Sequence, residues 1–277
     1  MIATPPVDPG LVARCRAVLA HAPAGLLSDI DGTLSAIAPT PAEAFVANEI
    51  KVSLAALAER LALVGVVSGR STEVGAAMIG VPDLLYIGNH GMERLHRGVW
   101  VAHADAAAYR EALGSALEEI GAAVAATAFA PIVLIEHKGL TGTVHYRLAA
   151  DADAAHAELA PIVAAAAARH GLRLTEGRLI LELRPPVTVT KGTAVATLIE
   201  EFGLRGALFL GDDLTDADAF LAIRRARERS GIDALAIGVL GPETPKRVRE
   251  TMDVGIDGVP AVAALLAALA AESDVEE

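Results

Sequence analysis

Two aspartates separated by one residue are the sharpest chemical signal in the chain. Asp29 and Asp31 directly follow an apolar run at residues 24–28. Alternate residues of an extended strand share a face, so both carboxylates can point into one pocket at the carboxyl edge of a parallel sheet. Two like charges in one site push their proton affinities apart. One carboxylate can then stay a nucleophile while the other transfers protons, and the pair can bind a divalent cation.

Two further segments could bind phosphate. Ser68, Gly69 and Arg70 end the apolar run at residues 63–67. A hydroxyl group and a free backbone N–H at the end of a strand suit a phosphate oxygen. Lys191 opens a helical pattern and supplies a compact cation that could neutralise both a phosphate and a nucleophile.

The fourth segment is again acidic. Asp212 and Asp213 follow the apolar run at residues 207–210. Carboxylates clustered at the end of a buried strand repel one another strongly at low dielectric. A hard cation with oxygen ligands removes that repulsion, and Mg²⁺ commonly takes one or two protein carboxylates together with phosphate and water.

The elements that must position these residues alternate between short apolar runs and longer helical patterns, which predicts a parallel sheet covered by helices. The expected strands are residues 24–28, 63–67, 84–87, 207–210 and 234–239. The expected helices are residues 48–61, with Asn48 as the cap, 71–79 and 193–202.

The middle of the chain has a different rhythm, namely helix, two strands, helix, two strands. The helices are expected at residues 105–126 and 154–170, and the strands at 132–136, 141–147, 172–175 and 178–183, with turns at Lys138-Gly139 and Glu176-Gly177. Such a module, with antiparallel strand pairs, is expected to be inserted into the parallel-sheet domain. We therefore expect a core of residues 1–104 and 185–277 and an inserted α/β domain of residues 105–184.

Composition limits the classes of partner. The net charge of −12 disfavours nucleic acid and anionic membranes as main partners, because proteins bind both through clusters of lysine and arginine. The apolar stretch at residues 121–135 is shorter than the roughly 20 residues that span a bilayer. The start of the chain does not look like a secretory signal, and Cys15 is the only cysteine among 277 residues. These features predict a soluble, cytoplasmic protein.

The four acidic, hydroxyl and lysine segments, in this order, resemble the haloacid-dehalogenase phosphatase superfamily. Further motifs narrow the resemblance to the trehalose-phosphate phosphatases, and they lie at residues 88–93, 136–139, 145–147, 181–185 and 211–220. The resemblance covers residues 24 to about 239. It implies a Rossmann-like parallel-sheet core of haloacid-dehalogenase type, an inserted α/β cap that closes over the core, and hydrolysis of trehalose 6-phosphate through an aspartyl-phosphate.

The resemblance also implies a role for each matching residue. Asp29 is the expected nucleophile, Asp31 the general acid and base, and Lys191 a phosphate-binding catalytic residue. The expected ligands of Mg²⁺ are Asp29, Asp31 through its carbonyl group, and Asp212, with Asp213 close by. The expected substrate-binding residues are Ser68, Gly69 and Arg70 in the core and Glu136, Lys138, Arg147 and Glu182 in the cap. Three positions, His137, Thr190 and Ala217, depart from residues common in the family.

Several alternatives stay open at this point. The substrate could be sucrose phosphate, a glycosyl-phosphoglycerate or another sugar phosphate, or the chain could be a phosphosugar mutase. A catalytically inactive sugar-binding module is disfavoured, because Asp29, Asp31, Lys191 and Asp212 are all present. His90 and His145 could contact substrate or could simply be packed, and the oligomeric state is not predicted.

Overall fold

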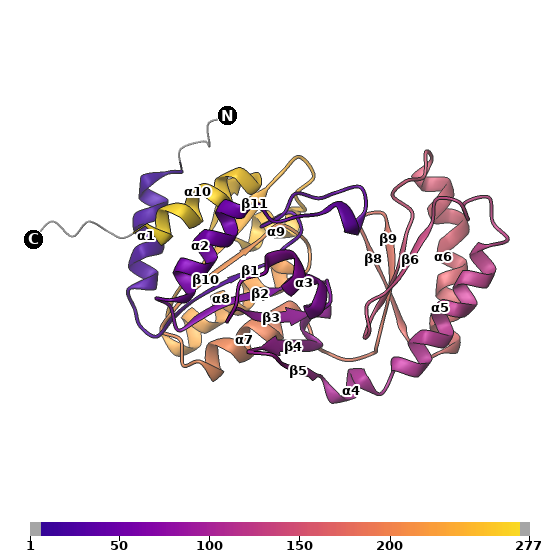
Figure 1. The fold of residues 1–277 in the computed structure, drawn as a ribbon, viewed down its shortest axis with the longest axis horizontal. Helices are drawn as coiled ribbons and strands as arrows, with labels where there is room; N and C mark the ends of the chain where they lie inside the picture. The colour runs from indigo at the N-terminus through magenta and orange to yellow at the C-terminus, as the bar shows by residue number, and fades with distance from the viewer. Residues whose placement is uncertain (1–6, 272–277) are drawn as a thin grey trace, which may run out of the picture. The chain divides into compact units, whose positions relative to one another are not determined.

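The computed structural model describes residues 7–271, which form two compact units (Figure 1). The first unit falls within Met1–Trp100 together with Val189–Glu277, and the second within Val101–Thr188. The second unit is thus inserted between two halves of the first.

The first unit is built on an 8-stranded sheet in the order β12-β11-β10-β1-β2-β3-β4-β5. Its strands are β1 (Ala24–Ser28), β2 (Leu63–Val67), β3 (Leu85–Gly88), β4 (Glu93–His96), β5 (Val99–Ala102), β10 (Gly206–Gly211), β11 (Asp233–Leu240) and β12 (Val254–Asp257). The strands from β12 to β3 pair in parallel, and β4 adds to β3 antiparallel. The predicted parallel sheet is confirmed, and the bounds of β1 and β2 agree with the prediction at both ends.

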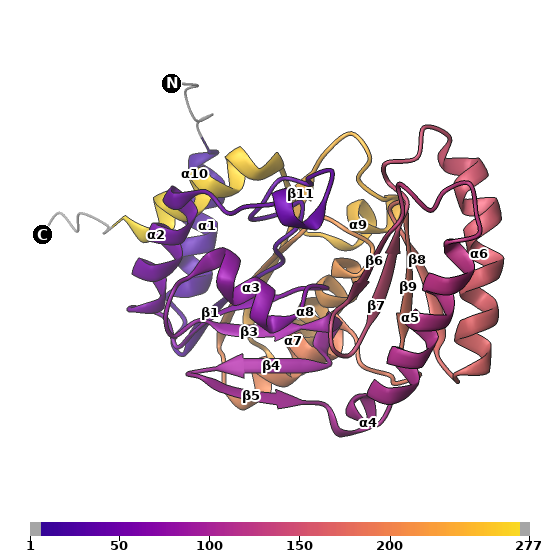
Figure 2. The ribbon, with the colours of Figure 1, turned by 45° about the vertical axis from the view of Figure 1, so that its right-hand side comes forward.

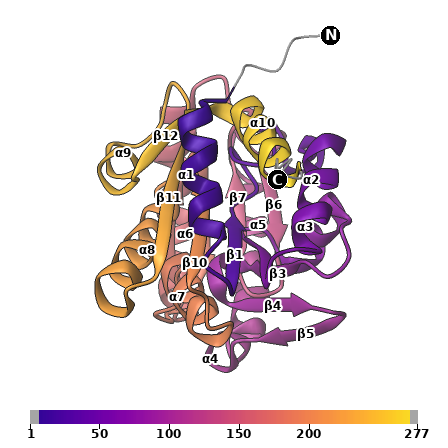
Figure 3. The same cartoon turned by 90° about the vertical axis from the view of Figure 1, so that its left-hand side faces the viewer.

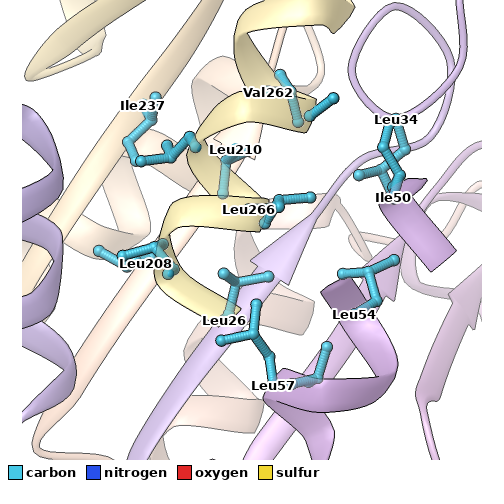
Figure 4. Packing of buried hydrophobic residues seen from close by; sticks show 14 of the residues in the cluster. Leu26, Leu34, Ile50, Leu54, Leu57, Leu208, Leu210, Ile237, Val262 and Leu266 are labelled. Carbon is cyan, nitrogen blue, oxygen red and sulfur yellow. The ribbon is translucent and has the colours of Figure 1, made fainter. Parts of the chain in front are cut away.

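Both faces of the central strands are apolar, as is usual for parallel strands covered on both sides. Leu26, Leu208 and Ile237 point to one face, where they pack with Leu54 and Leu266 (Figure 4). The alternate residues, among them Phe209, belong to a second apolar cluster on the opposite face. The strands are therefore held in place from both sides.

Two groups of helices supply these clusters. One group consists of α1 (Pro9–Leu19), α2 (Asn48–Ala58), α3 (Thr72–Ile79) and α10 (Gly258–Ala270). The other consists of α7 (Lys191–Glu201), α8 (Asp216–Ser230) and α9 (Lys246–Thr251). Figure 3 shows α1 beside α10, and α7 beside α8, with the strands of the sheet between the two pairs.

The second unit has a 4-stranded antiparallel sheet in the order β6-β7-β9-β8. Its elements are α4 (Ala104–Ala107), α5 (Arg110–Val124), β6 (Leu134–His137), β7 (Gly142–His145), α6 (Ala152–Arg169), β8 (Arg173–Gly177) and β9 (Ile180–Arg184). Figure 2 shows α5 and α6 along one face of this sheet, where their apolar side chains pack against Val144, Leu181 and Leu183. The predicted succession of helices and strands is confirmed.

Three local predictions were wrong. Asn48 is not the cap of α2, because Ala47 occupies that position and makes no side-chain cap. The turn between β8 and β9 lies at residues 178–179 rather than at Glu176-Gly177, with Leu179 at a φ of 57°. The expected helix at residues 105–126 begins instead as the separate short helix α4.

Several elements were not predicted, among them the helices α1, α8 and α9 and three strands. The hairpin of β4 and β5 extends the sheet beyond β3, and β12 adds a strand at the opposite edge. Within residues 7–271, no helix combines the length and the apolar character that crossing a bilayer requires.

Candidate active site

The order of the central strands brings the predicted motifs together. In the sheet, β1 lies between β10 and β2, and all three run parallel. Their carboxyl ends therefore meet at one edge, and each is followed by one of the polar segments. The backbone N–H of Asp29 donates to the carbonyl group of Leu210 at 2.9 Å, so the loop after β1 stays paired with β10.

Lys191 is the centre of a buried ionic group. Its Nζ lies 2.9 Å from Oδ1 of Asp29 and 2.8 Å from Oδ1 of Asp216, and its side chain is 1% exposed. Burial alone would lower the pKa of Lys191, but the carboxylates of Asp216 and Asp29 raise it well above its usual value. The lysine is therefore a fixed positive charge beside Asp29.

A capping box places Lys191 in this position. Thr190 is the N-cap of α7, where its hydroxyl oxygen accepts the N–H of Thr193 at 3.2 Å, and the Thr193 hydroxyl oxygen accepts the N–H of Thr190 at 2.9 Å. Lys191 is consequently the first residue of the helix. Threonine is a favoured N-cap residue. The helix therefore still begins at Lys191, although residue 190 differs from the residue common in the family.

Asp216 was given no role by the sequence, yet it organises the acidic loop. It begins α8 with no exposed surface, and its Oδ2 accepts the N–H groups of Asp212 and Asp213 at 3.0 and 3.1 Å. The signal that could have revealed it is its spacing of four residues from Asp212 at the start of a helix. A carboxylate there can accept the backbone N–H groups of the loop that precedes it.

The loops after β1 and β10 touch directly. Thr33 donates from its hydroxyl group to Oδ1 of Asp212 at 3.1 Å. Gly32, with a φ of +85°, lies so close that a Cβ atom there would overlap the Asp212 carboxylate. Glycine is thus required both for the backbone conformation and for the approach of the two loops.

The charges of this cluster are not balanced. Burial, reinforced by Asp213 and Asp31, raises the pKa of Asp29 to about 6 although Lys191 opposes the shift. Burial and the charges of Asp29 and Asp213 raise the pKa of Asp212 to about 8. Burial would also raise the pKa of Asp213, but Lys191 and hydrogen bonds from Thr215 hold it at about 2.

Such a cluster fits a cation. One ligand atom each from Asp29, Asp212 and Asp216 lies within 4.8 Å of the others. Both oxygens of Asp216 already accept hydrogen bonds, whereas Oδ2 of Asp29 and Oδ2 of Asp212 accept none from the residues that the structure describes. Asp29 and Asp212 are therefore the members best placed to bind a metal ion, and Asp216 is better suited to holding Lys191 and the loop.

The segment after β2 lies against the same site. Ser68 is buried, and its hydroxyl oxygen accepts the N–H of Arg70 at 3.2 Å. A Cβ atom on Gly69 would lie 2.6 Å from the ring of His90, which explains the glycine. His90 also helps to lower the pKa of Asp213, so its ring lies near the acidic cluster as well. The side chain of Arg70 binds Asp31.

The other predicted residues share one face of the sheet in the second unit. Glu136 is paired with Thr143 in register, and Thr143 with Glu182, so these three side chains form a row across the strands. Glu136 lies 2.9 Å from His145, and Glu182 lies 3.5 Å from Lys138. The Thr143 hydroxyl group is buried without a hydrogen-bond partner among the described residues.

Arg147 follows β7 and donates to the carbonyl group of Arg178 at 3.3 Å. The polar row thus provides carboxylates, a cation and a hydroxyl group on one face, while the opposite face packs against α5 and α6.

The chain is similar to known proteins in sequence and in fold. The sequence model of the trehalose-phosphatase family matches residues 27–245. A curated trehalose-phosphate phosphatase from Mycobacterium tuberculosis strain H37Rv is 33% identical over 260 residues, which cover 88% of this chain. The chain spans only 62% of the length of that relative.

Two solved structures share the fold. The C-terminal domain of a trehalose-6-phosphate phosphatase from Candida albicans superposes with a TM-score of 0.77 at 23% identity, covering 96% of this chain and 97% of that one. A haloacid dehalogenase-like hydrolase from Bacteroides thetaiotaomicron superposes with a TM-score of 0.61 at 13% identity, covering 87% and 97%. The predicted fold class is confirmed.

Proposed function

The chain belongs to the trehalose-phosphatase family, and on this premise we propose that it hydrolyses trehalose 6-phosphate to trehalose and phosphate. The observation that carries this proposal is the 2.9 Å contact between Asp29 and Lys191 beside Asp212, at one edge of the parallel sheet. A buried carboxylate next to a fixed cation is suited to attack a phosphorus atom while the cation offsets charge on the transferring group. We propose the cytoplasm as the compartment.

The first chemical step transfers the phosphoryl group to the protein. A carboxylate oxygen of Asp29 forms a bond to phosphorus, and the bond between phosphorus and the sugar oxygen breaks. The sugar oxygen keeps the electron pair and takes a proton from Asp31, because an alkoxide is a poor leaving group. Lys191 and Ser68 stabilise the oxygens of the transferring group.

The second step releases phosphate. Water attacks the phosphorus of the aspartyl-phosphate and gives a proton to Asp31, which the first step left as a carboxylate. The bond between phosphorus and Asp29 breaks, and Asp29 returns to its starting form. Asp31 therefore acts as an acid and then as a base in one cycle.

A magnesium ion fits the acidic cluster, in which burial and the neighbouring carboxylates raise the pKa values of Asp29 and Asp212. Asp29, Asp212 and the carbonyl group of Asp31 would hold it, with Asp213 beside them. When bound, Mg²⁺ offsets negative charge on the phosphate and on the carboxylates. Asp216 keeps the loop that carries Asp212 in place through its two backbone hydrogen bonds.

The row of polar side chains in the second unit is proposed to bind the sugar. Sugar hydroxyl groups need both donors and acceptors, and Glu136, Glu182 and Lys138 offer both. Arg147 adds a second cation at the end of β7. The buried hydroxyl group of Thr143, which has no partner among the described residues, lies between the two glutamates in the strand register.

A panel of phosphate esters tests this function. We expect phosphate release from trehalose 6-phosphate to exceed that from glucose 6-phosphate and sucrose 6-phosphate by at least about 10-fold in kcat/KM, equivalent to about 1.4 kcal/mol of discrimination, and to require Mg²⁺. The measurement is released phosphate with and without EDTA. Preference for another sugar phosphate would refute the substrate, and formation of a sugar bisphosphate instead of free phosphate would show a mutase.

The pKa shifts predict how pH and Mg²⁺ affect stability. The pKa values of Asp29 and Asp212 are raised from 3.8 to about 6 and about 8, so the folded protein holds protons that the unfolded chain releases. This contribution to stability is present below about pH 4 and is lost as the pH rises through 6 and 8. Mg²⁺ should offset the loss, so the increase in melting temperature caused by Mg²⁺ should be larger at pH 8 than at pH 5.

The control for this measurement is Asp212→Asn, which should remove most of the increase at pH 8. The measurement is the melting temperature of both proteins in EDTA and in Mg²⁺, at pH 5 and at pH 8. An effect of Mg²⁺ that is absent, or that does not change with pH, would contradict the proposed ligands.

A further inference from the structure

The side chain of Arg70 is bound to Asp31 and to the loop that contains Pro41. Its Nε donates to Oδ2 of Asp31 at 2.7 Å, and its Nη2 donates to Oδ1 at 2.7 Å. Its Nη1 donates to the carbonyl group of Pro41 at 3.1 Å. Each of its nitrogen atoms therefore already donates to an oxygen of the protein.

Arg70 is held more firmly than the carboxylate it binds. The arginine side chain is 11% exposed, against 38% for Asp31. Its backbone N–H donates to the Ser68 hydroxyl oxygen, and its guanidinium group also contacts the loop that contains Pro41. The planar guanidinium group thus forms a fixed support that connects the loops after β1 and β2.

The two parallel hydrogen bonds determine the orientation of the Asp31 carboxylate. A bidentate pair between arginine and a carboxylate restricts rotation of both groups, which a single contact with an ammonium group does not. A carboxylate offers about four acceptor positions, and the guanidinium group takes one on each oxygen. The remaining positions stay open, so Asp31 can exchange a proton with a substrate while it is bound to Arg70.

From this geometry we infer that Arg70 is a positioning residue for Asp31 and not a ligand of the transferring phosphoryl group. The inference rests on the proposed function, because it concerns the residue that donates the proton to the leaving group. Arg70 holds the Asp31 carboxyl group in the orientation from which it reaches the leaving oxygen. Loss of Arg70 should therefore slow a reaction only as far as that reaction needs the proton from Asp31.

Substrates with different leaving groups distinguish the two roles. Trehalose 6-phosphate has an alkoxide leaving group that needs a proton, whereas p-nitrophenolate leaves without one. The parameter kcat/KM reports the steps up to transfer onto Asp29, so it isolates the step that uses the acid. A lost phosphate ligand would lower kcat/KM for both substrates equally.

We expect Arg70→Ala to lower kcat/KM for trehalose 6-phosphate at least about 10-fold more than for p-nitrophenyl phosphate, because general acid catalysis is commonly worth 10²- to 10⁴-fold. Arg70→Lys should show the same selective loss, since it keeps the charge but not the pair of parallel hydrogen bonds. This second variant also serves if Arg70→Ala does not fold. The control is Arg94→Ala, which removes an arginine–carboxylate pair with Glu201 elsewhere in the same unit and should leave both substrates unaffected.

A double-mutant cycle completes the test. If Arg70 acts through Asp31, then Arg70→Ala should have little further effect on trehalose 6-phosphate once Asp31 is asparagine, within about twofold. Equal losses on both substrates, a wild-type substrate ratio in Arg70→Lys, or additive losses in the double variant would overturn the inference. A wild-type protein that cleaves p-nitrophenyl phosphate but no sugar phosphate would instead refute the proposed function.

Discussion

The substitution Asp29→Asn is expected to lower turnover of trehalose 6-phosphate by roughly 10⁴-fold or more, as loss of a catalytic nucleophile does in other enzymes. Asparagine has the shape of aspartate, but its amide group cannot form the acyl phosphate. The fold should persist, because Lys191 keeps its 2.8 Å contact with Asp216. The measurements are phosphate release and thermal unfolding of the same preparation.

Two further results bear on Asp29. The wild-type protein, quenched with acid during turnover, should carry the added mass of one phosphoryl group, and the variant should not. The control is Asp83→Asn, because Asp83 is 73% exposed and lies at a positive φ that asparagine also tolerates. Near-normal turnover by Asp29→Asn would refute the proposed nucleophile.

The second large effect is expected for Lys191→Met, which should reduce both activity and stability. Loss of the cation that faces the transferring group should lower kcat by roughly 10²- to 10³-fold. Removal of one partner from a buried ionic group should lower the free energy of unfolding by about 3 to 5 kcal/mol. Asp29 and Asp216 would then remain buried without the positive charge that contacts both.

Unfolding by urea, without divalent cations, measures this loss, and the loss should be smaller at pH 5 than at pH 8. At the lower pH the carboxylates can take protons, and Asp29 already has a pKa of about 6 beside the lysine. The matched control is Lys246→Met, because Lys246 is 88% exposed and forms an ion pair with Glu250 on its own helix. Equal unfolding free energies for the two methionine variants would show that Lys191 does not stabilise the cluster.

Prediction from sequence was most accurate where local patterns are strong. The runs that became β1 and β2 are short, almost wholly apolar and followed by polar turns, so their bounds could be predicted to the residue. The turn between β8 and β9 was misplaced because Glu176-Gly177 is a good turn signal, whereas the actual turn holds Leu179 at a positive φ. A bulky residue in that conformation is unfavourable by local rules, and the pairing of the strands overrides them.

Elements with mixed composition escaped prediction. The strand β4 contains Glu93, Arg94 and His96, and no local pattern marks it as part of a sheet. Glu93 is nevertheless buried, because its carboxylate accepts the N–H of Thr72 at 2.6 Å. A partner distant in the sequence decides this position.

The chemical identity of the site was already determined by the sequence, because carboxylates, a hydroxyl group and a lysine at the ends of apolar strands restrict the chemistry that is possible there. Which groups pair was decided only by the tertiary structure. Arg70 binds Asp31 rather than facing outward, and Asp216 holds Lys191 and the acidic loop. The physical reason is that electrostatic pairing depends on the distance between two groups and on how deeply they are buried. Both quantities are fixed only when strands that are far apart in the chain become neighbours in the sheet.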